Sequence, residues 1–265
     1  MPKVKCDDIN ICYEVQGKGF PLVMIMGLGA NMDWWDPSLI QELSKKFKTV
    51  IFDNRGTGRS DKGKAEFSVK LFADDAVRLM DNLGVKRAHV LGISLGGMIA
   101  QELVLNHSDR VEKLILCSTY CGGPQAVQPA PQVTSLLSGD RQGIPPEVLV
   151  KAAFPILFTA DFMKKNPDYM KQVTAQLLKA PTPPDVFTGQ LQAIQKFGTY
   201  DRLPKIKAPA LVMHGKKDIL VPPQNAKILA DRIPGAKLAY FENSAHALFS
   251  QETDKVLSTL LQFLA

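Results

Sequence analysis

Ser94 lies in a short glycine-rich segment whose residue types could support nucleophilic chemistry. Residues 92–97 read GISLGG, follow the apolar run 88–91 and precede a helix-like stretch. A serine between a strand and a helix lies on a sharp turn, and its flanking glycines let the neighbouring backbone approach because they carry no Cβ. Such a turn holds the hydroxyl at the C-terminal edge of a sheet, where open α/β folds place their active sites. We expect Ser94 to be a nucleophile; the segment alone also fits a glycine-rich turn with a capping serine.

A serine hydroxyl needs a base to remove its proton, and the chain offers four histidines. His246 follows the last expected strand in a loop ahead of the final helix, which brings it to the same sheet edge as the serine. The other histidines have structural interpretations. His89 and His214 lie within expected strands and fit core positions, and His107 ends a helix, where a cation is favourable. The predicted base is therefore His246.

The acid that orients this base should follow a strand and lie between the nucleophile and the base in the chain. Asp218 meets both conditions. Asp201 and Asp231 do not follow strands, and Glu242 is too close to His246 in sequence for a facing geometry. We expect Asp218 to hold the imidazole in one tautomer and to stabilise the imidazolium that forms.

Two backbone N–H groups are needed to stabilise an oxyanion. One is expected from Leu95, which follows the serine at the start of a helix whose dipole also helps. The other is expected from Leu28, in the loop after the third strand, because Gly27 and Gly29 permit a tight backbone path. A plain glycine turn is the alternative interpretation of this loop.

The loop 53–60, DNRGTGRS, also follows an expected strand at the active edge. We interpret Asp53 and Arg55 as residues that brace the backbone rather than as chemical groups. The loop does not match a phosphate-binding loop, because no Lys-Ser or Lys-Thr pair follows its second glycine.

The elements that must position these groups alternate along the chain. Most of the expected strands are short continuous apolar runs, typical of parallel strands covered on both faces, and the first two form a hairpin at one edge. We expect an α/β protein with a mostly parallel sheet and helices on both faces. The expected strands are 3–5, 9–15, 22–26, 49–52, 88–91, 113–117, 210–214 and 237–241, and the expected helices are 34–46, 69–83, 95–106, 224–232 and 253–264.

The alternation stops between residues 121 and 200. This segment lacks a strand pattern and is rich in proline, yet it holds many large apolar residues that a disordered linker would not. We expect short helices packed as a cap over the active edge. The predicted domains are a core of residues 1–120 and 201–265 and a cap of residues 121–200.

Composition narrows the class of protein. The 265 residues carry a formal charge of +6, but the lysines are scattered rather than gathered into a stripe, so nucleic-acid binding is not expected. The four cysteines occupy positions expected for buried thiols, and no stretch approaches the roughly 18 apolar residues of a membrane span. We expect a cytoplasmic protein without a membrane contact; the sequence gives no indication of its oligomeric state.

Together these segments resemble one family. The chain is similar to α/β-hydrolases of the esterase, 3-oxoadipate enol-lactonase and haloperoxidase-like group over nearly everything outside the cap. The resemblance implies an eight-stranded sheet, a helical cap inserted after the sixth strand, a Ser-His-Asp triad that needs no cofactor or metal, and a Trp35 near the pocket. The family usually has His-Gly before the oxyanion donor, whereas this chain has Met-Gly. The residues that carry the resemblance are Gly27-Leu28-Gly29, Trp34-Trp35, 53–60, 92–97, Asp218 and His246.

The expected reaction is hydrolysis of a carboxylic ester or lactone through an acyl-enzyme formed on Ser94. The apolar cap predicts a small apolar substrate, and the candidate contacts besides Trp35 are Phe154, Phe158 and Phe162. Perhydrolysis, as in haloperoxidase-like enzymes, or hydrolysis of a carbon–carbon bond could use the same triad. A small-molecule receptor that keeps the fold is an alternative from another class.

Overall fold

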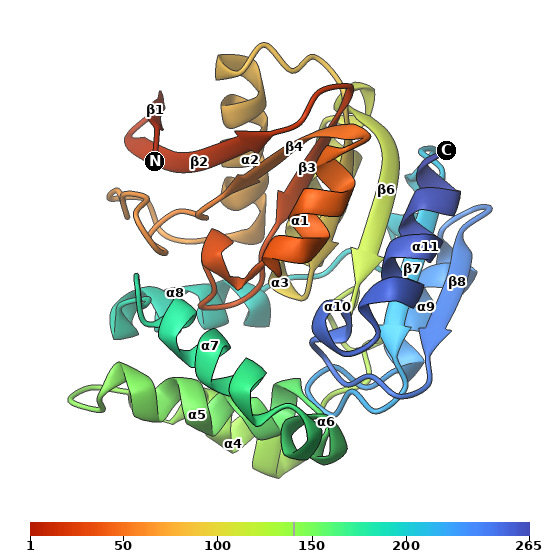
Figure 1. Ribbon diagram of the computed structural model, residues 1–265. Coiled ribbons are helices and arrows are strands. Elements are labelled where there is room, and N and C mark those ends of the chain that lie inside the picture. The colour runs from red at the N-terminus through yellow and green to blue at the C-terminus, as the bar shows by residue number, and fades with distance from the viewer. Residues whose placement is uncertain (140) are drawn as a thin grey trace.

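The computed structural model describes residues 1–139 and 141–265 and confirms the predicted α/β architecture (Figure 1). Within these residues, eight strands form one sheet in the order β1-β2-β4-β3-β5-β6-β7-β8. The β1–β2 and β2–β4 pairs are antiparallel, and the strands from β3 to β8 run parallel. The strands are β1 (Lys3–Cys6), β2 (Ile9–Gln16), β3 (Phe20–Ile25), β4 (Phe47–Phe52), β5 (Ala88–Ile93), β6 (Val111–Cys117), β7 (Ala210–Gly215) and β8 (Lys237–Phe241).

Both faces of the sheet are covered, because successive side chains of a strand point to opposite faces. In β3, Leu22 and Met24 share one buried cluster with the helices at Pro37–Ser44 and Thr253–Leu264, whereas Val23 and Ile25 share another with the helices at Val69–Asn82 and Leu95–Asn106. These buried runs explain why the strands read as continuous apolar segments. The covering helices are α1 (Pro37–Ser44), α2 (Val69–Asn82), α3 (Leu95–Asn106), α9 (Gln224–Arg232), α10 (Leu248–Gln251) and α11 (Thr253–Leu264), with 3₁₀ turns at Met32–Trp34, Ser108–Arg110 and Leu203–Lys205.

The single helix predicted over residues 34–46 is wrong at its start. A 3₁₀ turn ends at Trp34, and α1 begins only at Pro37, capped by the side chain of Asp36. Proline suits the first helical position because its missing N–H needs no partner there, and it keeps the preceding residue out of the helical region. Asp36 accordingly has ψ 124°, and Trp35 is left in the connection before the helix.

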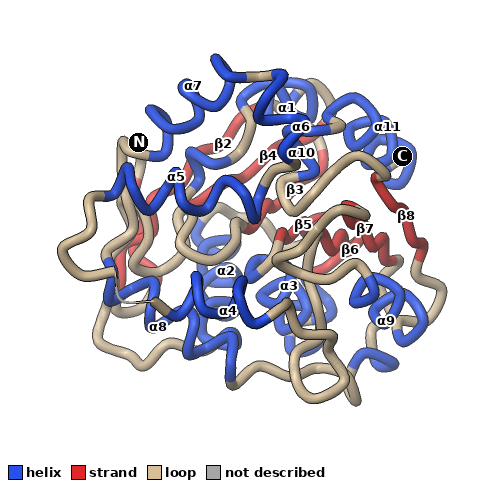
Figure 2. Tube along the Cα trace, turned by 90° about the horizontal axis from the view of Figure 1, so that it is seen from below, coloured by secondary structure: helices blue, strands red, loops and turns tan. Residues whose placement is uncertain are grey.

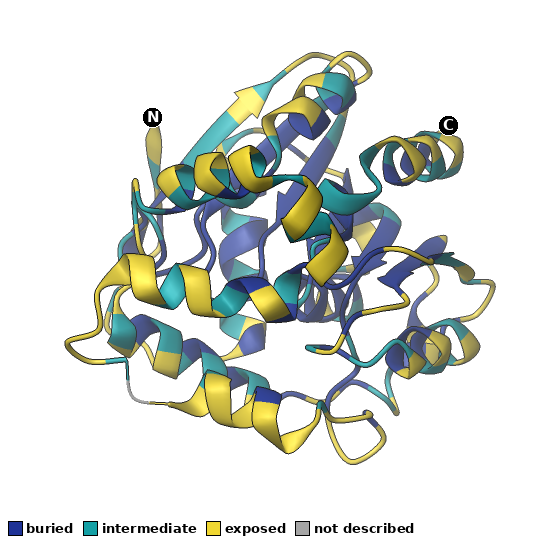
Figure 3. Ribbon diagram, turned by 60° about the horizontal axis from the view of Figure 1, so that its bottom comes forward, coloured by how far each residue is buried: buried dark blue, intermediate teal, exposed yellow. Residues whose placement is uncertain are grey.

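A helical cap follows the sixth strand, as predicted. Its five described helices lie together beyond the C-terminal edge of the sheet (Figures 1 and 2), and their outer faces are exposed while the strands behind them are buried (Figure 3). An isolated β-bridge between Gly122 and Gly198 joins the two ends of the insertion. The cap helices are α4 (Pro131–Ser138), α5 (Pro146–Leu157), α6 (Ala160–Lys165), α7 (Pro167–Leu177) and α8 (Pro184–Gln195).

All four cysteines are buried free thiols, which agrees with their predicted positions. Cys6 and Cys12 lie in the β1–β2 hairpin, Cys117 ends β6, and Cys121 stands where the cap begins. Burial raises the pKa of Cys6 to about 11 and also raises the pKa of Cys117. Across the part of the chain that the structure describes, no helix combines the length and the apolar character needed to cross a membrane.

Candidate active site

Ser94 occupies a strained turn between β5 and α3. Its φ of 56° and ψ of −122° lie where a residue with a side chain rarely stands. A Cβ on Gly92 would collide with the carbonyl oxygen of Gly96, and a Cβ on Gly96 would collide with the carbonyl of Ile25. The Ser94 N–H donates to the carbonyl of Cys117 at 2.9 Å, which ties the turn to β6. The two glycines are therefore required by the close approach of α3 to the sheet, and the turn lifts Ser94 to the sheet edge.

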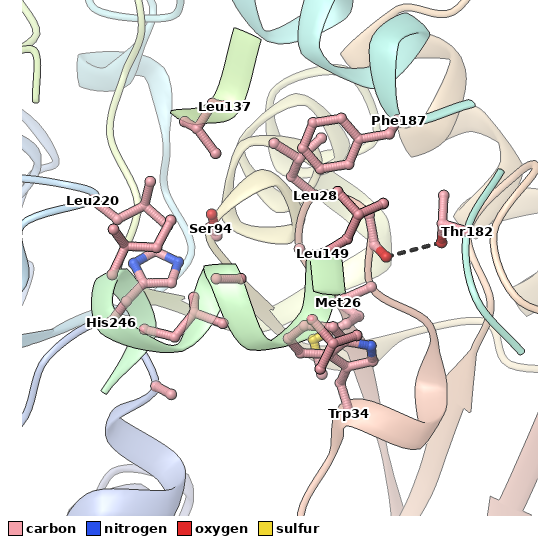
Figure 4. A pocket seen from close by; sticks show the side chains of 18 of the residues that line it. Met26, Leu28, Trp34, Ser94, Leu137, Leu149, Thr182, Phe187, Leu220 and His246 are labelled. Carbon is pink, nitrogen blue, oxygen red and sulfur yellow. Dashed lines mark hydrogen bonds between the residues drawn. The ribbon is translucent and has the colours of Figure 1, made fainter. Parts of the chain in front are cut away.

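Asp218 and His246 come together at the same edge. Asp218 lies in the loop after β7, and its Oδ2 is 2.8 Å from Nδ1 of His246, in the loop after β8. The other oxygen of Asp218 accepts the N–H groups of Leu220 and Val221 at 2.9 Å each. These contacts fix the carboxylate, which in turn orients the imidazole. His246 and Ser94 line one cavity, and their side chains lie near each other on its wall (Figure 4).

The charge of Asp218 is stabilised despite its burial. Desolvation alone would raise its pKa, but the charge of His246 and hydrogen bonds from His214 and His246 outweigh that effect and lower the pKa of Asp218 to about 2. The carboxylate is therefore ionised at neutral pH, and it can stabilise an imidazolium at His246.

His214 contributes to this arrangement in a way that the sequence did not reveal. It is fully buried in β7, as expected for a core residue, but its Nε2 lies 3.2 Å from Oδ2 of Asp218 and 2.9 Å from the carbonyl oxygen of Val221. A carbonyl oxygen only accepts, so Nε2 carries a proton that both oxygens share. His214 thus supports the carboxylate that orients His246.

The loop after β3 lies directly beside Ser94. A Cβ on Gly27 would lie 3.1 Å from the Ser94 Cβ and 3.7 Å from its Oγ. The N–H groups of Leu28 and Leu95 have no hydrogen-bond partner within the described residues, as an oxyanion hole requires. The geometry is compatible with the predicted donors, which stay predictions.

The cap holds this loop in place. The N–H of Gly29 donates to Oε1 of Gln190 at 2.8 Å, and the hydroxyl of Thr182 donates to the carbonyl of Gly29 at 2.8 Å. From the core side, the Asn54 amide donates to the carbonyl of Met26 at 3.0 Å. These three hydrogen bonds hold the backbone on both sides of Leu28. Gln190 and Thr182 carry no sequence signal that would have linked them to this loop.

The loop 53–60 braces the backbone, as we interpreted it. The buried carboxylate of Asp53 accepts the N–H of Met32 at 2.8 Å and the N–H of Arg59 at 2.7 Å. The guanidinium of Arg55 is fully buried and forms two hydrogen bonds, of 2.7 and 2.8 Å, with Asp75 in α2. Both side chains are committed to internal contacts.

A cavity of about 1110 Å³ lies between the cap and the sheet edge. Ser94 and His246 lie on its core side, and Leu137, Leu149 and Phe187 contribute apolar surface from the cap (Figure 4). Its lining is dominated by aliphatic and aromatic side chains. The cavity therefore suits a substrate with an apolar body.

The four predicted substrate contacts divide into two groups. Trp35 and Phe158 line the cavity, whereas Phe154 and Phe162 are not among its described lining residues. Phe154 packs edge-on against Phe158 with ring centroids 5.7 Å apart, and Phe162 stacks on the same ring at 5.7 Å. Phe154 and Phe162 thus belong to the apolar interior of the cap. The cap needs such a cluster because each of its short helices must bury an apolar face against a neighbour.

Comparison with known proteins identifies the class. The family described as "alpha/beta hydrolase fold" matches residues 21–253, so the chain belongs to the α/β-hydrolase family. A protein of Caulobacter sp. (strain K31) named "Putative carbamate hydrolase RutD" is 31% identical over 250 residues, which cover 92% of this chain and 90% of that protein. The matches support hydrolase activity.

Two solved structures are also similar over nearly the whole chain. The enol-lactonase from Burkholderia xenovorans LB400 has a TM-score of 0.88 and 27% identity, with 99% of both chains covered. The esterase EaEST from Exiguobacterium antarcticum has a TM-score of 0.85 and 25% identity, with 98% of both chains covered.

Proposed function

We propose that this protein hydrolyses a carboxylic ester or a lactone with Ser94, His246 and Asp218 as its catalytic triad. The observation that carries the proposal is the 2.8 Å contact of Asp218 with His246, which lines the same cavity as the strained Ser94 turn. A nucleophile on a strand-to-helix turn and a base oriented by a buried carboxylate are the parts that acyl transfer requires. Similarity to an enol-lactonase and an esterase supports the same reaction.

The reaction proceeds in two halves. Ser94 Oγ attacks the substrate carbonyl while His246 Nε2 takes the hydroxyl proton, and the resulting oxyanion accepts the N–H groups of Leu28 and Leu95. Collapse of the tetrahedral intermediate expels the alcohol, which receives the proton from His246, and leaves an acyl-enzyme. Water then gives a proton to His246 and attacks the acyl carbon, and the carboxylic acid leaves as Ser94 recovers its proton.

A carbamate is the second candidate substrate, because relatives that match almost the whole chain are named as carbamate hydrolases. The attack and the oxyanion would be the same, and Ser94 would then carry a carbamoyl group in place of an acyl group. The apolar wall of the cavity favours the ester or lactone with an apolar body.

The test is a chain-length series of p-nitrophenyl esters, from acetate to decanoate, with an N-alkyl p-nitrophenyl carbamate of matched length. Wild type, Ser94→Ala and Ser258→Ala are compared, the last because Ser258 is an exposed serine on α11. We expect hydrolysis to fall to background in Ser94→Ala alone. Undiminished turnover in Ser94→Ala, or a wild type inactive on every ester, would overturn the proposal. Turnover of the carbamate alone would select the second candidate.

A further inference from the structure

Arg141 is the one Lys or Arg among the described residues that line the cavity. It lies in the connection between α4 and α5, and its guanidinium carbon stands 3.5 Å from the centroid of the Phe187 ring. Its Nε is buried and has no hydrogen-bond partner among the described residues. The cavity therefore contains a guanidinium that stacks on the Phe187 ring and whose buried Nε–H is free to donate a hydrogen bond.

Contacts connect this cation to the reaction centre. The Phe187 ring lies so close to Gly29 that a Cβ there would come within 2.6 Å of it. Gly29 follows Leu28, and Gly27 on the other side stands next to Ser94. Figure 4 shows Phe187, which belongs to the cap, near Leu28 of the loop after β3. A group bound at Arg141 therefore shares the cavity with the bond that Ser94 attacks.

No carboxylate among the described residues that line the cavity pairs with Arg141. Two carboxylates line the cavity, but Asp33 pairs with Arg59 at 2.7 Å, and Asp36 caps α1 and accepts the Tyr169 hydroxyl. Burial lowers the pKa of Arg141, yet a guanidinium stays protonated in proteins. The half-buried side chain of Arg141 keeps its buried Nε donor unpaired, which is unfavourable, and a bound anion would supply the missing partner.

We propose that Arg141 binds a carboxylate carried by the substrate at a point remote from the scissile carbonyl. The ring of Phe187 supports one face of the guanidinium and leaves its N–H edge for a carboxylate, which matches the guanidinium fork with two parallel hydrogen bonds. The preferred substrate is then an ester or lactone with an apolar body and one anionic end. This inference rests on the proposed hydrolysis and names its substrate class.

Kinetics test the proposal with the carboxylate placed either on the acyl part or on the alcohol part of the ester. Mono-p-nitrophenyl esters of succinate, glutarate, adipate and suberate are compared with neutral p-nitrophenyl esters of equal length, and 4-carboxyphenyl butyrate with phenyl butyrate. We expect one anionic ester to exceed its neutral partner about 10- to 100-fold in kcat/KM, which corresponds to about 1.4 to 2.8 kcal/mol. Arg141→Gln should abolish this preference by lowering kcat/KM for the anionic ester more than for its neutral partner, and Arg141→Lys should keep part of it.

Lys151→Gln is the matched control, because it removes one positive charge from an exposed position on α5, outside the cavity lining. Equal losses in Lys151→Gln and Arg141→Gln would attribute the preference to long-range attraction and overturn the site. Absence of any anionic preference in wild type, with neutral esters still hydrolysed, would overturn it too and leave the proposed function intact.

A binding measurement separates the two proposals. Ser94→Ala is titrated calorimetrically with glutarate, adipate and suberate, and with hexanoate as the singly charged control. Tighter binding of one dicarboxylate, lost in Ser94→Ala/Arg141→Gln, would support the site even if no ester were hydrolysed. Equal binding to both proteins would refute it.

Discussion

Gln190 tests whether the cap positions the proposed oxyanion loop. Its side chain on α8 is fully buried, and its Oε1 accepts the Gly29 N–H at 2.8 Å, one residue beyond Leu28. Gln190→Met keeps the length of the side chain and removes the acceptor. The Gly29 N–H then has no partner. Of the two hydrogen bonds that join Gly29 to the cap, only the one from Thr182 remains.

The expected magnitude follows from the single hydrogen bond. Leaving a buried N–H without a partner destabilises a protein by about 1 to 3 kcal/mol. The oxyanion donor itself is displaced rather than deleted, so turnover should fall less than the 100- to 1,000-fold that follows removal of a donor. A loss of about 1 to 2 kcal/mol in transition-state binding corresponds to roughly a five- to thirtyfold fall in kcat. KM should change less than about twofold, because the donor acts mainly in the transition state.

The assay measures kcat, KM and the melting temperature with p-nitrophenyl butyrate as substrate. Gln190→Glu keeps an acceptor oxygen and should retain most of the turnover. Thr182→Val removes the hydrogen bond to the Gly29 carbonyl and reports the effect of loosening the loop from the other side. A Gln190→Met protein with lowered melting temperature but unchanged kcat would refute the idea that this contact positions the loop for catalysis.

Two further predictions concern groups away from the cavity. His89 packs against Phe20 and Phe47, and burial lowers its pKa to about 4. Below about pH 6.5 the imidazole is protonated in the unfolded chain but stays neutral in the folded protein. The free energy of unfolding should therefore drop by up to about 3 kcal/mol between pH 6.5 and 4. Urea unfolding at several pH values should show a smaller pH slope in His89→Leu, and an identical slope would contradict this origin. Arg55→Met leaves the buried Asp75 carboxylate with only the 3.4 Å contact to Arg78 among the described residues. The protein should lose about 3 to 5 kcal/mol of stability, as measured by urea unfolding at pH 7, with part of the loss recovered in Arg55→Met/Asp75→Leu. A loss below 1 kcal/mol, the size typical of surface pairs, would show that this pair does not stabilise the core.

The sheet could be predicted because its strands are buried on both faces and read as apolar runs. Their bounds shift by only a few residues; β3, for example, begins at Phe20 rather than at residue 22. Ser94, Asp218 and His246 each follow a strand of this sheet, and the carboxyl ends of parallel strands share one edge. That rule alone brings the three residues to one place.

The cap shows where sequence patterns stop being informative. Phe154, Phe158 and Phe162 recur every four residues, a spacing that suits ring-to-ring packing within the cap as well as contact with a ligand. Only the folded chain shows that Phe158 lies at the junction between the cap interior and the cavity. Gln190 and Arg141 were missed because each acts through a contact with a residue far away in the sequence.

The same limit applies inside a strand. His214 fits a core position, and its exposure is indeed zero. Its second contact depends on how the loop after β7 folds back to place Asp218 and Val221 against it. Local periodicity describes a strand but not the path of the loop that follows it.

The buried thiols give this protein a built-in chemical reporter of opening. Only a thiolate reacts with an alkylating reagent, and burial disfavours the thiolate as well as blocking access to it. Modification of each cysteine by iodoacetamide must therefore wait for the surrounding structure to open. Cys6 and Cys12 would record fraying of the edge hairpin, Cys121 detachment at the cap boundary, and Cys117 opening of the sheet centre. The rates of labelling at these positions, read by mass spectrometry of peptides, would rank the stability of each region without any engineered probe.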